Sequence, residues 1–240
     1  MQQFLIINQF AQNPERDRVI YKLFSTESTV SWDEVWYLVH DFSTSYFLKR
    51  FQEQARTDNR AYIRKYFELF AMRLKMQQGK YSEVKPVLDK LLTDPNTDGD
   101  YEKLFTARVY QAEAECAKEA KKETEQNNWL YRLYTLYPQL VPYCGMPMNM
   151  RLHISGDIDP AVEKRLRACN IHAVTNSSIP APDAFVIFTK NGAKKDITYY
   201  VLDAKGNYIV QKQSFAWQKP EETGVALAYR LFNIGGKGEE

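Results

Sequence analysis

The stretch VPYCGMP, residues 141–147, separates two regions whose hydrophobic residues follow different periods. Before it, apolar residues recur at spacings of three and four; after it, short β-rich runs alternate with two helical patterns. Its two prolines and its glycine cannot continue a regular helix. The sequence therefore predicts an α+β fold, with an all-α domain of repeat-like helical hairpins over residues 1–145 and a small α/β domain over residues 149–240.

The composition is typical of a globular protein in water. Apolar residues make up 44% of the 240 residues, and 32 Lys and Arg nearly balance 30 Asp and Glu. This balance counts against general binding to nucleic acid or anionic membranes. No run of eighteen apolar residues is present, so no transmembrane segment is expected. Residues 1–8 lack the features of a signal peptide. This predicts a cytoplasmic location, or a periplasmic or cell-envelope one if an export signal was replaced by Met1.

Several amphipathic helices are predicted before residue 145. Pro14 suits the first turn of a helix that ends near Phe24. A capping-box pattern at residues 31–34 then opens an apolar pattern that continues to Phe51. Further helices are expected over residues 59–78, from after Gly79-Lys80-Tyr81 to Asp94-Pro95, over 101–122, and over 127–137.

Aromatic residues concentrate in this helical part. Of the 13 Phe, 16 Tyr and 4 Trp, nine lie in residues 150–240 and the others precede them. Large aromatic side chains usually lie inside a protein, so the sequence favours an aromatic core. The alternative is an exposed aromatic groove that holds a peptide partner.

One helical hairpin carries a recognisable spacing of residues. It consists of Ala71, Leu74, Gly79, Tyr81, Val84, Leu88, Leu91 and Pro95. This spacing resembles a tetratricopeptide repeat, in which a small residue turns the hairpin and an aromatic residue packs two positions later. Val84 stands where that family usually has alanine, and Pro95 falls about one residue early. The match covers about one repeat; a second, degenerate hairpin is expected over 101–137.

The second region predicts the element order β-α-β-β-β-β-α. Strands are expected over 150–155, 171–175, 184–188, 197–202 and 208–216, with a helix after the Asp159 cap and another from Pro220. The continuous apolar run 184–188 predicts a central strand buried on both faces. The pattern resembles the small α/β domains that accompany helical repeats in bacterial cell-envelope lipoproteins.

The segment Asp94–Asp100 matches the first half of a calcium-binding loop. Oxygen ligands alternate up to Gly99, and Glu102 stands at the ninth position. The twelfth position requires a bidentate Glu, but Phe105 occupies it. A polar turn between two helices is the favoured interpretation, and calcium binding is the alternative.

The cysteines do not predict a disulfide framework. Cys116, Cys144 and Cys169 are widely spaced and odd in number, which favours reduced structural thiols over one bridge and a free thiol. Cys169 and His172 have half the spacing of a zinc site. A structural zinc site needs four ligands, so we expect a buried thiol beside a strand histidine.

Other residues suggest catalytic groups only weakly. Cys144 would need a base such as His40 or His153, and nothing local brings them together. Asp157 and Asp159 form a carboxylate pair, but capping a helix explains Asp159 sufficiently. The sequence therefore predicts no catalytic, cofactor-binding or metal-binding residues.

These observations lead to a functional expectation. The chain is expected to be a non-enzymatic interaction or scaffold protein, possessing a concave helical surface for a protein or peptide partner and no cofactor. The alternatives are a calcium-stabilised binding module and a hydrolase with a site between the domains. A cleft that holds Cys144, or a histidine hydrogen-bonded to a carboxylate, would favour the hydrolase.

Overall fold

The computed structural model describes residues 44–93, 100–156, 158–169, 171–191, 194–217 and 219–234. The predicted helix at 14–24 and the capping box at 31–34 lie outside these residues. Contacts divide the chain into two compact units, Met1–Phe105 and Thr106–Glu240. The predicted seam at 141–147 falls inside the second unit, where it contributes to the 3-10 helix η2 (Pro138–Cys144).

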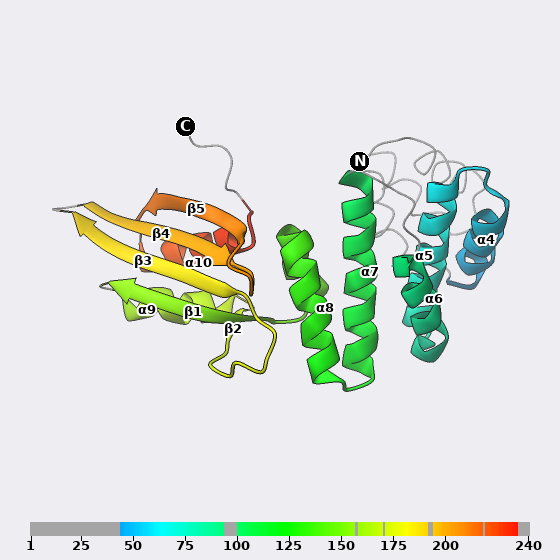
Figure 1. Ribbon diagram of the computed structural model, residues 1–240, viewed down its shortest axis with the longest axis horizontal. Coiled ribbons are helices and arrows are strands. Elements are labelled where there is room, and N and C mark those ends of the chain that lie inside the picture. Colours follow the sequence, from blue (N-terminus) through cyan, green and yellow to red (C-terminus); the bar gives the residue numbers. More distant parts are fainter. Residues whose placement is uncertain are drawn as a thin grey trace, which may run out of the picture. The chain divides into compact units, whose positions relative to one another are not determined.

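The first unit contains the predicted helices as α4 (Thr44–Thr57), α5 (Ala61–Gln77) and α6 (Tyr81–Thr93) (Figure 1). Gly79, with a φ of 75°, makes the turn between α5 and α6, where glycine adopts a positive φ without strain. Helix α4 packs on α5 through an aromatic core, as the sequence predicted. Its rings belong to Phe51, Tyr66, Phe67, Phe70 and Phe105.

Helix α7 (Asp100–Glu119) contains the boundary between the units, and α8 (Glu123–Leu136) follows it in the second unit. The structure begins α8 four residues before the predicted start at residue 127. Glu123 and Glu125 lie in its first turn, where acidic side chains interact favourably with the helix dipole.

The remainder of the second unit confirms the predicted order β-α-β-β-β-β-α. Its elements are β1 (Met148–Gly156), α9 (Pro160–Ala168), β2 (Ile171–Ala173), β3 (Asp183–Asn191), β4 (Lys194–Leu202), β5 (Tyr208–Ala216) and α10 (Pro220–Leu231). They form one sheet of strand order β2-β1-β3-β4-β5. β1 pairs in parallel with β2 and β3, and β3, β4 and β5 pair antiparallel. Asp159 caps α9 as predicted, accepting a hydrogen bond of 2.8 Å from the backbone of Ala161.

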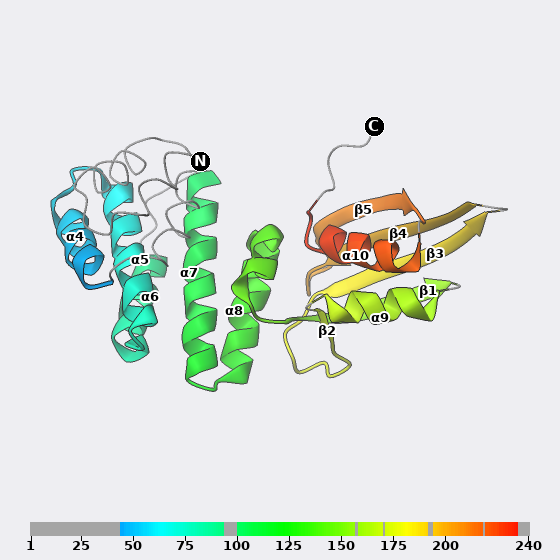
Figure 2. The same ribbon diagram turned by 180° about the vertical axis from the view of Figure 1, so that it is seen from behind.

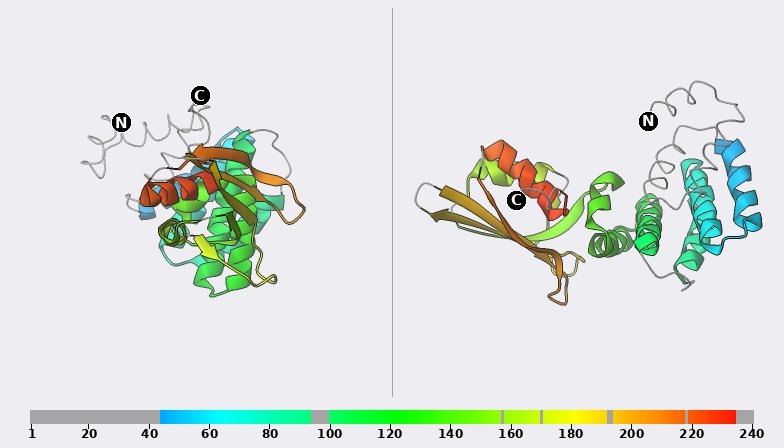
Figure 3. Two further views of the ribbon diagram at one scale, coloured as in Figure 1. Left: turned by 90° about the vertical axis from the view of Figure 1, so that its left-hand side faces the viewer. Right: turned by 90° about the horizontal axis from the view of Figure 1, so that it is seen from above.

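Helices α9 and α10 pack against each other on the same face of this sheet (Figures 2 and 3). Ala184, Val186 and Phe188 of β3 are buried under this helical layer, whereas Phe185 and Ile187 are only half-buried. The prediction that β3 is buried on both faces is therefore wrong. The reason is that α9 and α10 both lie on one side, which leaves the other face without a helical layer among the described residues.

Helix α8 is fixed to the α/β layer by two tyrosines one turn apart. The hydroxyl of Tyr134 donates a hydrogen bond to the carbonyl oxygen of Leu231, which ends α10 and has no partner within the helix. Burial raises the pKa of the Tyr134 phenol. The hydroxyl of Tyr131 accepts a hydrogen bond of 2.8 Å from the backbone of Ala204, in the turn between β4 and β5.

Candidate functional site

The candidate site is the sheet face opposite α9 and α10, which we call the open face. Side chains alternate across a strand, and the register places His153 of β1 beside Phe185 of β3, which lies beside Tyr200 of β4. Tyr208 of β5 pairs with Leu202 and lies next to Tyr200. Four rings from four strands thus form one row across the open face, here called the aromatic row.

The inner rings of the aromatic row stack face to face. The ring centroids of His153 and Phe185 are 4.5 Å apart at 14°, and those of Phe185 and Tyr200 are 4.7 Å apart at 10°. These spacings match the distance between neighbouring strands, about 4.8 Å. The rings therefore stand roughly perpendicular to the sheet. Each ring covers a face of its neighbour, so the ring edges point to solvent.

The row ends differently at its two sides. Tyr208 meets Tyr200 edge-on at 5.9 Å and is 49% exposed, and the ammonium of Lys212 lies 6.0 Å from the Tyr200 centroid. At the other side the His153 side chain is 48% exposed. Partly exposed rings with a cation beside them provide both apolar area and a cation–π contact.

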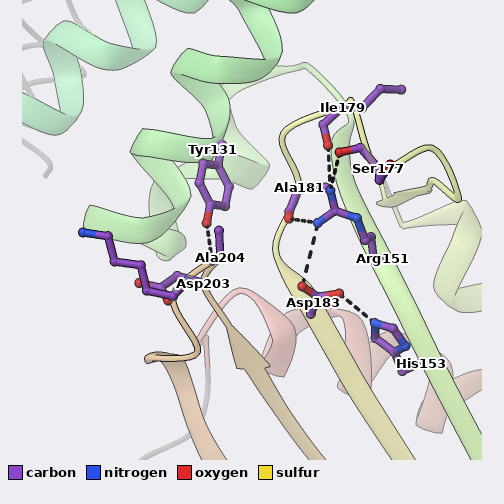
Figure 4. Close-up of polar contacts among 10 residues, drawn as sticks. Tyr131, Arg151, His153, Ser177, Ile179, Ala181, Asp183, Asp203 and Ala204 are labelled. Atoms are coloured by element: carbon purple, nitrogen blue, oxygen red, sulfur yellow. Dashed lines mark hydrogen bonds and ion pairs between the residues drawn. The ribbon is translucent and has the colours of Figure 1, made fainter.

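A polar cluster adjoins the row where Arg151 of β1 pairs with Asp183, the first residue of β3 (Figure 4). The Arg151 guanidinium donates to the carbonyl oxygens of Ala181 at 2.6 Å and Ile179 at 3.0 Å, and lies 3.8 Å from the Asp183 carboxylate. It also donates to the carbonyl of Ser177 at 3.3 Å. Arg151 thereby holds the loop between β2 and β3 at this end of the open face.

Asp183 connects this cluster to the aromatic row. Its Oδ1 lies 2.7 Å from Nε2 of His153. Because a carboxylate only accepts hydrogen bonds, Nε2 carries the proton, and Nδ1 of a neutral ring keeps its lone pair. The contact fixes the tautomer and, together with the Phe185 stack, the ring plane of His153. A fixed imidazole of this kind can accept a proton or a hydrogen bond.

Of the catalytic candidates considered from the sequence, His153 lies in this site and Cys144 does not. Cys144 is in η2, where its thiol donates to the Leu140 carbonyl at 3.4 Å. His40 and Asp157 lie outside the described residues. No disulfide bond joins Cys116, Cys144 and Cys169, and the Cys169 side chain is half-buried, not buried as predicted.

The metal-site hypotheses gain no support from the described part of the chain. Most of the Asp94–Asp100 loop, residues 94–99, lies outside it, and Asp100 is the first residue of α7. Phe105 is buried and packs edge-on against Tyr66 at 4.9 Å, so it serves the core. Cys169 and His172 flank the start of β2, and His172 is exposed. Within the described ranges, no three His, Cys, Asp or Glu side chains are grouped to hold a metal ion.

No protein-family model, curated protein or solved structure matches this chain. Among the described helices, none has the length and apolar character needed to cross a membrane.

The sequence interpretation missed the aromatic row. The alternating pattern of β1 did place Arg151, His153 and Ser155 on one face, and this was the available signal. The corresponding signal in β3 was hidden, because all five residues 184–188 are apolar. His153 and Asp183 are thirty positions apart and meet only through the pairing of β1 with β3.

Proposed function

We propose that this chain is a non-enzymatic interaction protein that holds a protein partner on the open face of its sheet. The observation that carries the proposal is the aromatic row of His153, Phe185, Tyr200 and Tyr208. Phe185 and Tyr200 are half-buried and Tyr208 is exposed, so part of this apolar surface stays in water. Apolar surface left in water is typical of interaction sites, and Tyr is enriched where proteins meet. The stacked rings and the Arg151–Asp183–His153 cluster also make this surface rigid, which lowers the entropy lost on binding.

The helical unit supports the same role. The α5–α6 hairpin buries Leu74, Val84 and Leu88, positions that belong to the spacing resembling a tetratricopeptide repeat. Repeats of that family offer surfaces to peptides, and a second such surface suits a scaffold. The location in a bacterial cell envelope, implied by the lipoprotein resemblance, stays a prediction.

Site-specific photocrosslinking tests the proposal. A benzophenone amino acid replaces Tyr208 on the open face or, as the matched control, Tyr229 on α10, which is similarly exposed at 52%. In the source cells, the probe at Tyr208 should capture a protein that the probe at Tyr229 does not. The captured protein, once identified and purified, should bind the purified chain. Equal capture from both positions, or capture from neither, would contradict the proposal.

A hydrolase is the second candidate, because His153 is hydrogen-bonded to the Asp183 carboxylate. In this hypothesis the Nδ1 lone pair of His153 activates a water molecule. Asp183 holds the tautomer in which Nε2 carries the proton and Nδ1 is free to accept one. A screen with ester and phosphoester substrates tests it. Turnover that is lost in Asp183→Asn and kept in Glu222→Gln, an exposed carboxamide control on α10, would establish catalysis. Absence of turnover in the wild-type chain would remove this candidate.

A further inference from the structure

Strand β1 has a partly open outer edge. β2 pairs with it only from Met148 to Met150, whereas β1 continues to Gly156. Within the described residues no strand pairs with residues 151–156 on that side. The opening is therefore six residues long, about 20 Å, bounded by β2 at one end and by the turn at Gly156 at the other.

The direction of the backbone groups at this edge follows from two hydrogen bonds. The carbonyl of Met150 accepts from Val174 on the β2 side at 3.0 Å, and the N–H of Arg151 donates to Pro182 on the β3 side at 2.9 Å. Backbone groups alternate sides along a strand. Leu152 and Ile154 consequently direct their N–H and C=O groups to the outer edge.

The opposite edge of the sheet is protected in a way that β1 is not. β5 has register shifts opposite Val201 and an exposed Lys212 beside Tyr200, and bulges and lysines hinder the addition of further strands. Residues 151–156 of β1 keep a continuous register with β3. No Lys or Pro interrupts them.

The aromatic row ends at the same edge. His153 stacks with one ring face on Phe185, and its other face looks away from β3, toward the outer side of β1. A strand added at this edge would place one of its side chains beside that ring. The half-buried Leu152 and Ile154 on the helical side would adjoin its alternate side chains.

From this geometry we infer that the partner supplies a short extended segment that adds to β1 at Leu152 and Ile154. It carries an aromatic side chain stacked on His153 and apolar side chains on the helical side. The inference rests on the proposed function and names the chemistry of its partner. Strand addition gives affinity through backbone hydrogen bonds and specificity through alternate side chains.

The probe for this inference is an acetylated and amidated peptide, Lys-Val-Thr-Val-Tyr-Val-Thr-Val-Lys. Its valines share one face and its tyrosine the other. Two control peptides have the same sequence with N-methylated backbone amides. The first is methylated at the four valines, and the second at the two threonines and the tyrosine. Only one of these sets of amides faces β1, so one control should bind about tenfold more weakly or worse while the other keeps its affinity. Equal affinity of all three peptides, or no binding of the unmethylated peptide, would overturn the inference.

Variants of the full chain locate the peptide. Ile154→Pro removes an N–H at the edge and should abolish binding, whereas Ile154→Val should not. His153→Ala should weaken peptide binding about three- to tenfold. In that variant, changing the peptide tyrosine to threonine should weaken binding no further, because the stacking partner is already absent. As a readout that needs no variant, the amides of Leu152 and Ile154 should become protected from hydrogen exchange when the peptide binds.

The outcomes separate this inference from the proposed function. If binding persists in Ile154→Pro, or if Leu152 and Ile154 gain no protection, the edge is not the docking site and the inference fails. The captured partner would still require the aromatic row in that case. If Ile154→Pro instead converts a dimer of the chain into monomers, the occupant is a second copy and the inference is also overturned. Loss of selective capture at Tyr208 is the result that would end the proposed function itself.

Discussion

Replacing Phe185 by leucine should destabilise the sheet because it removes the ring between His153 and Tyr200. Each stacked pair contributes about 0.5–1.5 kcal/mol beyond the area it buries. Phe185 makes two such pairs, with centroids 4.5 and 4.7 Å away and nearly parallel planes. Leucine keeps most of the half-buried apolar surface, so the lost stacking should lower the free energy of opening of the sheet, measured by amide hydrogen exchange, by about 1–3 kcal/mol.

A double-mutant cycle isolates the stacking. The free energy of opening is measured by amide hydrogen exchange in β3 and β4 for Phe185→Leu, Tyr200→Leu and the double variant. The coupling energy between the two positions should be about 1 kcal/mol. Phe185→Leu combined with Tyr229→Leu, on the helical layer, should be additive within about 0.5 kcal/mol. Equal coupling in both pairs, or coupling near zero between Phe185 and Tyr200, would show that the rings do not stack in solution.

Three further predictions concern the framework. Gly156→Ala should lower the free energy of unfolding, measured with denaturant, by at least about 2 kcal/mol, since the residue has a φ of 91° and a methyl group would overlap the Phe188 carbonyl oxygen. An unchanged denaturation midpoint would contradict this turn. Tyr134→Phe should cost about 1–2 kcal/mol, because it leaves the last carbonyl of α10 buried and unpaired; no loss in the same assay would mean that this contact is absent. The side-chain hydrogen bond from Arg60 lowers the pKa of Asp58, so this pair stabilises the folded chain fully above about pH 4 and less as the pH falls further. Asp58→Asn should therefore lower the free energy of unfolding by about 1–2 kcal/mol at pH 7 and by progressively less below pH 4. A difference between the two chains that stays constant with pH would refute the pairing.

Local signals explain why the element order was predictable. Pro160 after the Asp159 cap, Gly206 in the β4–β5 turn and Pro220 at the start of α10 each act within a few residues of the chain. Such signals decide where a helix or strand begins and ends, and the structure follows them closely. The predicted helix boundaries in α5 and α6 rest on the same kind of information.

The open face depended on information that one segment does not contain. The apolar run 184–188 is compatible with burial on one face or on both, and only the placement of α9 and α10 on the same side decides between them. The His153–Asp183 contact likewise requires β3 to pair with β1 rather than with β2, its predecessor in sequence. Long-range pairing, not local preference, therefore creates the candidate site.

The most direct test of the central claim is a calorimetric comparison of partner affinity. The purified captured partner is titrated into the wild-type chain, Tyr200→Ala and the control Tyr229→Ala. If the partner docks on the aromatic row, Tyr200→Ala should weaken binding by at least about tenfold, whereas Tyr229→Ala should leave it unchanged. Equal affinity for all three chains would contradict the claim that the open face holds the partner.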